Sequence, residues 1–426
     1  MAVTRPAHSP PPARLPGALA WLRSLRVASP AWLDEQAWRL LVGFADTLVE
    51  LLGRWPDDPD ATQAARSARL LDLKRALAAH GYGAPDGSAT PQLQPLLQFV
   101  CGYHDVDLRD VATIGHGRLL ARHGTNVQRA TWLPRLCTGA LCGIAMTEPH
   151  GGTQLQATTT ALTPAAGSSG RLRLDGEKCY VSRLLEAEVF VVVCRHADHG
   201  LSAVVLEPTR PGIARQPLRP AGLRGWTWGT LTFDQVPINP GDLLGRPGTA
   251  AALLAEHFAA FRPLVAATAL GGAAAVVDEV LARLGQRLDF GWIRAPRDSA
   301  LATLGRHAAA IHAGLLACLA ATSLAAAGDP TAATWGLLVK AHGVDAAWHA
   351  AAEVGLLAGA LGYQADHRID KTRRDLDGLR YADGIHEELY RAAGRVMLTS
   401  TRANSRPHPA TGLPLPTVDD LVTAQP

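Results

Sequence analysis

The sequence predicts an α+β protein in which a β-rich segment separates two helical segments. From 30 to 139, apolar side chains recur every three or four positions, which is the period of an amphipathic helix. Residues 140–248 instead carry short β-branched runs such as 189–194, separated by glycine, proline and aspartate turns. From 249 to 404, long stretches rich in alanine and leucine return. These patterns predict an N-terminal helical domain, a middle β-barrel or sandwich domain and a C-terminal four-helix bundle.

The two ends of the chain show no such pattern. Residues 1–29 contain arginine and proline but no continuous apolar core with a cleavage site, so we expect a flexible arm and not a secretory signal. Residues 405–426 are rich in proline, and we expect them to form a tail.

Composition argues against several classes of protein. The chain has 426 residues, 47% of them apolar, which is enough to bury a large core. Its 41 Lys and Arg nearly balance 38 Asp and Glu, so the net charge of +3 does not predict nucleic-acid binding. We expect no membrane span, because no apolar run reaches the roughly 20 residues that one needs. The six cysteines are scattered without metal-ligand spacing, which predicts free thiols, no metal site and a cytoplasmic location.

The segment around residue 146 carries the most informative motif. The run AMTEP (145–149) is preceded by a Leu-Pro pair and followed by GGTQ (151–154). A Thr-Glu-Pro turn with two glycines is by itself an ordinary loop. With its flanks it resembles the signature of the acyl-CoA dehydrogenase superfamily, flavoproteins that oxidise acyl thioesters. The resemblance implies that Met146, Thr147 and Thr153 bind FAD and that Thr153 also contacts the substrate.

A second motif, DGEKCYVS (175–182), is similar to the strand of this family that faces the flavin. Tyr180 stands where the family has Trp, and Ser182 where it has Thr. The resemblance implies that the Tyr180 ring covers the isoalloxazine and that the Ser182 hydroxyl faces flavin N5. Both roles are chemically sensible, because an aromatic ring can stack and a hydroxyl can form hydrogen bonds. The alternative interpretation is an ordinary surface strand.

The helical C-terminal region carries two further elements of the resemblance. Arg287 and Phe290 match an Arg-x-x-Phe-Gly element whose side chains reach the FAD of a neighbouring subunit. The fork of an arginine suits the FAD pyrophosphate. Gly359 and Ala360 match a turn where the backbone approaches this pyrophosphate, and small residues are needed there. Asp298 stands where the family often has Gln, which is a departure from the pattern.

The segment RDLDGLRYADG (374–384) supplies the candidate base. In the family an Arg-Asp pair is followed, without gaps, by a glutamate that removes the α-proton of the substrate, and here this position is Asp383. The resemblance also implies that the Asp383 N–H holds the thioester carbonyl, that Arg262 and Gly384 lie against the substrate, and that Glu387 touches the adenine half of FAD. The alternative is that Asp383 only caps the following helix.

Together the motifs imply an FAD-dependent acyl-thioester dehydrogenase. Ala259 replaces a family Asp that contacts pantetheine, so the thioester carrier is open between CoA and acyl carrier protein. The aspartate base and the composition resemble the branch that serves polyketide extender-unit pathways, with a small polar acyl group. Electrons would pass to an electron-transferring flavoprotein or to O2. The shared flavin site implies a homodimer or homotetramer.

Two alternatives to a dehydrogenase stay open from the sequence. One is a flavin-dependent oxidase or monooxygenase on the same fold, in which reduced flavin reacts with O2. The other is a redox-inactive scaffold that binds carrier proteins.

Overall fold

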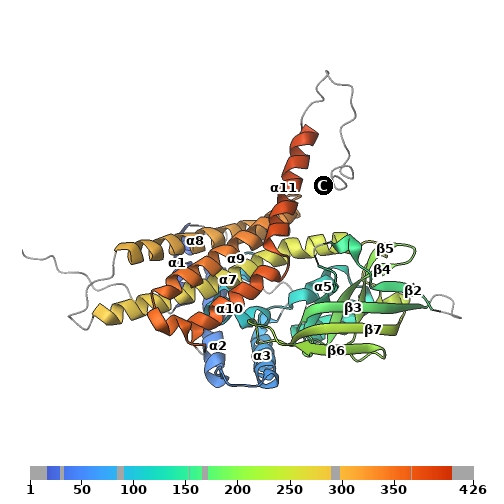
Figure 1. The fold of residues 1–426 in the computed structure, drawn as a ribbon, viewed down its shortest axis with the longest axis horizontal. Helices are drawn as coiled ribbons and strands as arrows, with labels where there is room; N and C mark the ends of the chain where they lie inside the picture. The colour runs from blue at the N-terminus through green and yellow to red at the C-terminus, as the bar shows by residue number, and fades with distance from the viewer. Residues whose placement is uncertain are drawn as a thin grey trace, which may run out of the picture.

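The computed structural model describes residues 17–28, 33–83, 91–152, 154–165, 171–288, 298–365 and 367–404. Thr153, Phe290, the predicted tail and the first 16 residues of the predicted arm lie outside the described residues. Within the described ranges, the predicted order of helices, sheet and helices is confirmed, and Figure 1 shows the sheet beside one end of a long helical bundle.

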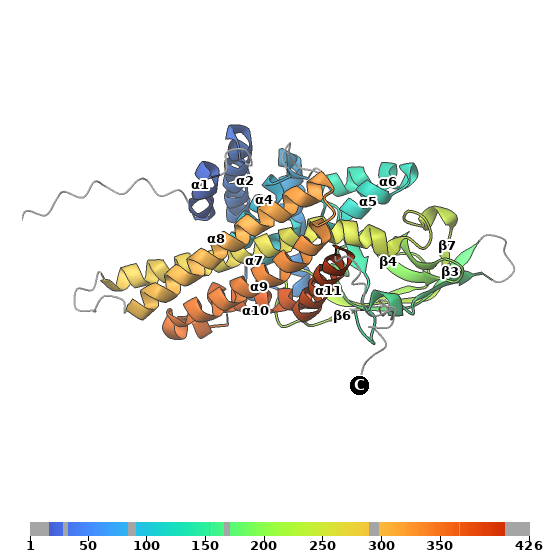
Figure 2. The ribbon, with the colours of Figure 1, turned by 90° about the horizontal axis from the view of Figure 1, so that it is seen from above.

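The helices before the sheet pack against one side of the bundle, as Figure 2 shows for α1, α2 and α4. Asp34, Thr62 and Thr125 cap three of them by accepting hydrogen bonds from backbone N–H groups in the first turn. In the described residues these helices are α1 (Ala18–Ala28), α2 (Glu35–Arg54), α3 (Gln63–Leu77), α4 (Leu93–His104), α5 (Arg118–His123) and α6 (Asn126–Cys137).

Residues 18–28 of the predicted arm instead form α1, a packed helix. Leu19, Leu22 and Leu25 lie on one face at a helical spacing and are all buried. Trp21 on the same helix donates a hydrogen bond from Nε1 to Asp278 at 3.1 Å. The helical pattern covers only about three turns directly after a proline-rich stretch, so the sequence alone did not reveal it.

The β-rich middle of the chain forms one mixed sheet, seven strands in the described residues. The central strand β4 is valine-rich and almost wholly buried, as expected for a strand covered on both faces. It pairs in parallel with β1 and β2 along one edge and antiparallel with β5 along the other, while β3, β7 and β6 extend the sheet beyond β2. The strands are β1 (Cys142–Ala145), β2 (Ala161–Pro164), β3 (Leu172–Ser182), β4 (Val189–His196), β5 (Gly200–Leu206), β6 (Ile213–Leu218) and β7 (Trp228–Ile238).

The C-terminal bundle is built around α7, which Figure 1 shows running from the sheet to the opposite end of the bundle. Glycines let α4 cross α7 at backbone contact. A Cβ on Gly102 would lie 1.9 Å from the Thr268 carbonyl oxygen, and one on Gly271 would lie 2.1 Å from the Phe99 carbonyl oxygen. The bundle helices are α7 (Ala250–Leu288), α8 (Asp298–Ala327), α9 (Ala332–Leu356), α10 (Arg368–Tyr381) and α11 (His386–Asn404).

Two of these helices correct the expectation that no apolar run is long enough to cross a membrane. The segment Ala250–Arg287 of α7 and helix α8 both pass on length and composition, with 83% and 39% of their most apolar windows buried. Length and composition alone are weak support for a span, since the core helix of a bundle passes the same test.

A buried ion cluster joins the two helical regions to the sheet. The ammonium of Lys371 on α10 donates to Asp105 at 2.6 Å, to Asp107 at 2.9 Å and to Asp375 at 2.7 Å. Asp375 also accepts the N–H of Leu223, from the connection between β6 and β7, at 2.6 Å. The three carboxylates lie close enough to hold a metal ion, but Lys371 supplies the positive charge that they share.

Replacing Lys371 with Met would remove the ammonium that the three carboxylates share and leave Asp107 paired with Arg109 at 3.6 Å. We expect the free energy of unfolding to fall by about 3–5 kcal/mol, as for other broken buried ion pairs. Urea denaturation followed by circular dichroism measures this loss. Arg54→Met, which breaks an exposed pair with Glu50, is the control and should cost less than about 1 kcal/mol. If the Lys371 variant is as stable as this control, the ion cluster around Lys371 does not stabilise the fold as proposed.

Candidate active site

The AMTEP motif lies where β1 ends, and β3 holds its backbone from one side. Lys178 Nζ donates to the Met146 carbonyl at 3.0 Å, and the Cys179 N–H donates to the Thr147 carbonyl at 2.9 Å. Because the C=O and N–H of a trans peptide point in opposite directions, the Thr147 N–H is turned away from Lys178. Met146 and Thr147 are both half-buried, so this segment is accessible to a ligand.

Glu148, the next residue, anchors the same loop from within the protein. Its carboxylate is 2% exposed and accepts a hydrogen bond from Lys178 at 2.7 Å. It also accepts the backbone N–H and the hydroxyl of both Thr159 and Thr160. Burial alone would raise the pKa of Glu148, but these hydrogen bonds outweigh burial and hold the pKa well below its usual range. The glutamate of the motif is therefore ionised at neutral pH and has a structural role.

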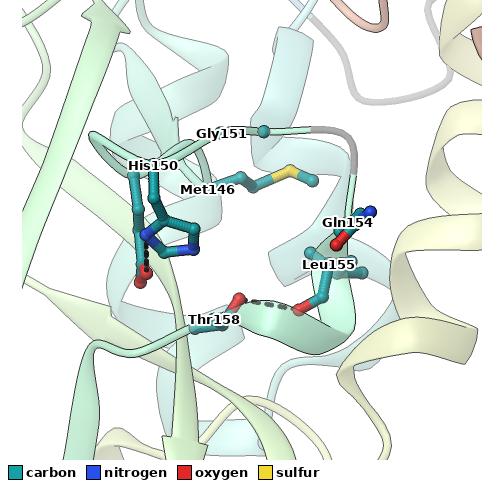
Figure 3. A pocket seen from close by; sticks show the side chains of 8 residues that line it. Met146, His150, Gly151, Gln154, Leu155 and Thr158 are labelled. Atoms are coloured by element: carbon teal, nitrogen blue, oxygen red, sulfur yellow. Dashed lines mark hydrogen bonds and ion pairs between the residues drawn. The ribbon is translucent and has the colours of Figure 1, made fainter.

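A small hollow opens beside Met146. Figure 3 shows the Met146 side chain lying across it, between His150 and the turn at Gln154 and Leu155. Gly151 has a φ of 147°, which only glycine adopts without strain. The hollow is lined by Met146, Glu148, His150, Gly151, Gly152, Gln154, Leu155 and Thr158.

Tyr180 and Ser182 lie at the end of β3, where the strand leaves regular pairing. The ladder with β7 shifts register between Lys178 and Val181, and Tyr180 has a φ of 55°. The Tyr180 residue is 64% exposed, so its ring is available to stack on a planar group. Ser182 is half-buried, and its Oγ accepts a hydrogen bond from Arg183 at 2.8 Å.

These groups fit a flavin. An exposed aromatic ring, a hydroxyl and a backbone N–H lie on two segments, 146–148 and 180–182, and Lys178 and Cys179, directly before the second segment, donate hydrogen bonds to the first. The charges of Lys178 and Glu148 lie within the protein and neutralise each other, so they do not disturb a neutral ring system. The isoalloxazine of FAD could thus be held here by stacking and hydrogen bonds.

Asp383 lies in the turn between α10 and α11. Its φ is 57° and that of Gly384 is 113°, so two consecutive residues have left-handed backbone. Arg262 Nε on α7 donates to the Asp383 carbonyl at 3.1 Å, and Lys340 Nζ on α9 donates to the Gly384 carbonyl at 2.7 Å. Two helices of the bundle therefore fix the turn through its backbone.

The Asp383 side chain is not a helix cap. Helix α11 begins at His386, and the Asp383 carboxylate accepts no hydrogen bond from its first turn or from any other described residue. Burial lowers the pKa of Lys340 to about 7, and the charge of Asp383 opposes this shift. Burial likewise lowers the pKa of Arg262 to about 10, again opposed by Asp383. Asp383 therefore interacts electrostatically with both Arg262 and Lys340, and Asp345 also acts on Lys340.

The remaining predicted site residues form a second group away from the sheet. Arg287 is half-buried in the last turn of α7, and its Nη2 lies 3.9 Å from the position of a Cβ on Gly359. Gly359 and Ala360 are exposed. Because α7 ends at the end of the bundle away from the sheet, this group is separated from β3, the strand that carries Tyr180 (Figure 1). Glu387 is exposed on the first turn of α11, and the structure gives it no partner among the described residues.

Lys340 and Arg183 were not predicted as part of this site. For Lys340, the sequence offered one indication: lysine is rare in this chain, where only four of the 41 Lys and Arg residues are lysines. A lysine kept in such a sequence indicates a place where arginine does not fit. No comparable signal marks Arg183.

Replacing Glu148 with Gln tests the anchor of the loop. We expect a loss of about 3–5 kcal/mol in the free energy of unfolding at pH 7, because Lys178 would stay buried without a counter-charge. The folded-state pKa of Glu148 lies below its unfolded value of about 4.3, so its contribution is present above that pH and is lost as the pH falls below it. Urea unfolding between pH 7 and 3 should show the two proteins converging.

Glu50→Gln, a change at an exposed pair on α2, is the matched control and should show no such convergence. A constant difference between wild type and Glu148→Gln across this pH range would contradict the ionised, hydrogen-bonded state of Glu148.

Comparisons with known proteins agree with this geometry. A family model described as acyl-CoA dehydrogenase, middle domain, matches residues 143–236, and one described as acyl-CoA dehydrogenase, C-terminal domain, matches residues 248–398. An acyl-CoA dehydrogenase of Bacillus subtilis (strain 168) is 27% identical over 283 residues, which cover 62% of this chain and 70% of that protein.

Solved structures share the fold. An acyl-CoA dehydrogenase from Geobacillus kaustophilus covers 86% of this chain and 99% of its own, with a TM-score of 0.75 and 21% identity. An acyl-CoA dehydrogenase complexed with FAD from Bacillus anthracis covers 86% of this chain and 68% of its own, with a TM-score of 0.77 and 18% identity. Together the two family models span more than half of the chain. The chain therefore belongs to the acyl-CoA dehydrogenase family, FAD-dependent oxidoreductases that act on CH–CH groups.

Proposed function

We propose that the chain dehydrogenates an acyl thioester and that Asp383 is the base that removes the α-proton. The observation that carries this proposal is the turn at Asp383. Arg262 and Lys340 hold two successive carbonyls of the turn, while the carboxylate itself makes no hydrogen bond among the described residues. A carboxylate fixed through its backbone, with its oxygens unengaged, is available to take a proton.

The proposed reaction forms a Cα=Cβ double bond. The α-proton passes to the Asp383 carboxylate. The electron pair of the broken Cα–H bond forms the new π bond as a hydride leaves Cβ. FAD supplies the hydride acceptor when it is bound. Negative charge that develops on the thioester carbonyl oxygen needs a hydrogen-bond donor. We assign this role to the Asp383 N–H, and place Gly384 and Arg262 against the acyl group.

The flavin site is proposed at the two segments that β3 joins. The Tyr180 ring would stack on the isoalloxazine, the Ser182 hydroxyl would meet N5, and Met146 and Thr147 would line the edge of the ring system. Support comes from the exposed Tyr180 and from the Thr147 N–H, which Lys178 turns away from β3.

The acyl group is proposed to be small and polar. Arg183 is buried against Ser182 and pairs with the buried Asp110, which the half-buried Arg109 also approaches, and Arg183 interacts electrostatically with Asp383. A long alkyl chain that extended past Ser182 would have to pack against these charges, which is unfavourable. A short group with its own hydrogen-bonding atoms matches them.

We propose acyl carrier protein as the thioester carrier, with CoA as the other candidate. Ala259 is buried at 6% exposure and offers no carboxylate to a pantetheine arm, so recognition would depend on other contacts. An electron-transferring flavoprotein or O2 would reoxidise the flavin. A role in polyketide extender-unit biosynthesis belongs to the same proposal.

A homodimer or homotetramer is proposed because Arg287, Gly359 and Ala360 lie at the end of the bundle opposite Tyr180. They could complete the flavin site of a second copy. Helix α11 projects from the body of the protein in Figure 1 and exposes the apolar side chains of Tyr390 and Leu398, which a second copy would cover. Light scattering of the purified protein measures the assembly.

The base is tested with Asp383→Asn. The purified wild type should retain flavin, and small acyl thioesters on CoA and on carrier protein should bleach its visible absorption anaerobically. We expect Asp383→Asn to keep the flavin but to bleach at least about 100-fold more slowly, because general-base catalysis contributes 10²–10⁴-fold. Asp377→Asn, at a half-exposed carboxylate on α10, is the control and should bleach like the wild type.

The outcomes separate the competing functions. Loss of bleaching only in Asp383→Asn supports the dehydrogenase, and the better of the two carriers identifies the substrate class. Flavin that no thioester bleaches would favour an oxidase or monooxygenase. A colourless protein would favour the redox-inactive scaffold and end the enzymatic proposal.

A further inference from the structure

We propose that Arg183 is a positioning residue that fixes the Ser182 hydroxyl as a hydrogen-bond donor toward the flavin and thereby raises the flavin reduction potential. The inference rests on the proposed function, since it requires that Ser182 faces the flavin. It adds a residue that the family motifs do not mark and that lies directly after the motif in the chain.

The backbone brings the two side chains together. Neighbouring residues of a regular strand point to opposite faces and do not meet. Arg183 has a φ of 58°, so β3 ends here in a left-handed residue that departs from this alternation. The guanidinium consequently lies beside the preceding residue, with Nη1 at 2.8 Å from Ser182 Oγ.

The guanidinium is locked in this position. Its Nη2 donates to Asp110 Oδ1 at 2.6 Å, and the two side chains are only 5% and 3% exposed. Burial alone would raise the pKa of Asp110, but Arg183 and Arg109 outweigh it and keep the carboxylate ionised. Lys74 in turn holds the Asp110 carbonyl at 2.9 Å. The arginine therefore cannot swing away from Ser182 without leaving its counter-charge.

The direction of the Ser182 O–H follows from this contact. A hydroxyl has one hydrogen and two lone pairs, whereas a guanidinium only donates. Arg183 occupies one lone pair of Ser182 Oγ, so the hydroxyl hydrogen must point elsewhere. A hydrogen bond from a charged donor also polarises the O–H and strengthens its own donation.

Such a donor favours the electron-rich form of a flavin. A strengthened O–H at the ring withdraws electron density, and a fixed positive charge nearby acts in the same direction. Asp110 offsets much of the charge of Arg183 at longer range, so the hydrogen bond through Ser182 should carry most of the effect. Arg183 also interacts electrostatically with Asp383, so its charge acts on the proposed base as well.

The test is a double-mutant cycle on the midpoint potential of the holoenzyme. The variants are Arg183→Met, Ser182→Ala and the two combined, with the potential measured by dye-linked reduction. We expect Arg183→Met to lower the potential by about 30 mV, a tenfold change in the two-electron equilibrium constant. In the Ser182→Ala background the same change should have little further effect. Arg173→Met, at a half-exposed arginine on β3, is the control and should leave the potential unchanged.

The outcomes distinguish this inference from the proposed flavin site. If Ser182→Ala leaves both the potential and the flavin spectrum unchanged, Ser182 does not face the flavin and the site itself is misplaced. If Ser182→Ala shifts them but Arg183→Met has the same effect in both backgrounds, or none, only the role of Arg183 is overturned. Should Arg183→Met fail to fold, Arg183→Lys keeps the charge but replaces the two-nitrogen fork, whose Nη1 and Nη2 reach Ser182 and Asp110, with one nitrogen on a shorter side chain. Arg183→Lys is then expected to lower the potential when Ser182 is present and to have little effect in the Ser182→Ala background.

Discussion

Buried ammonium groups hold the backbone of this protein at the points where the proposed site is assembled. Lys178 holds Met146, Lys340 holds Gly384, and Lys74 holds the carbonyls of Asp110 and Thr113. A buried amino group must be hydrogen-bonded, so each contact fixes the backbone segment that accepts from it. The segments around Met146, Gly384 and Asp110 are therefore all held by the same kind of interaction, a hydrogen bond from a buried lysine to a backbone carbonyl.

That dependence also explains how three separate regions of the chain act as one unit. The sheet supplies Ser182, the bundle supplies Asp383, and the N-terminal region supplies Asp110. Lys371 and its three carboxylates tie the same regions together near the start of α10, away from the base turn. Loss of a pair in either place would loosen the relation between the base and the flavin surface as well as the stability of the fold.

The order of helices and strands could be predicted from the sequence because each segment has a long, regular pattern. Shorter patterns were harder to recognise. Helix α1 has only about three turns beside a proline-rich stretch, and α7 and α8 look polar enough in places that their full apolar length was underestimated. The predicted middle β-domain is confirmed as a mixed sheet, whereas the order and pairing of its strands could not be predicted, since strand pairing is not encoded in local periodicity.

The site could be predicted in part, for a similar reason. Motifs such as AMTEP and the Asp383 turn are contiguous, so a resemblance can mark them. The contact between Lys340 and Gly384 joins residues 44 positions apart on two elements, and only the packing of α9 against the base turn creates it. The pairing of Arg183 with Ser182 depends on a left-handed residue at the end of a strand, which arginine rarely adopts and no local pattern announces.

The placement of lysine has a chemical consequence for a protein that handles thioesters. A thioester transfers its acyl group to a free primary amine without any catalyst, and accessible lysines are the usual targets on a protein surface. Here the four lysines lie inside, and even Lys371, whose side chain is 23% exposed, shares its ammonium among three carboxylates. The cationic side chains left for the surface are arginines, whose guanidinium stays protonated and is not a nucleophile. Burial and ion pairing thereby keep the lysine amines of this protein away from thioesters in solution, the class of compound that it is proposed to bind.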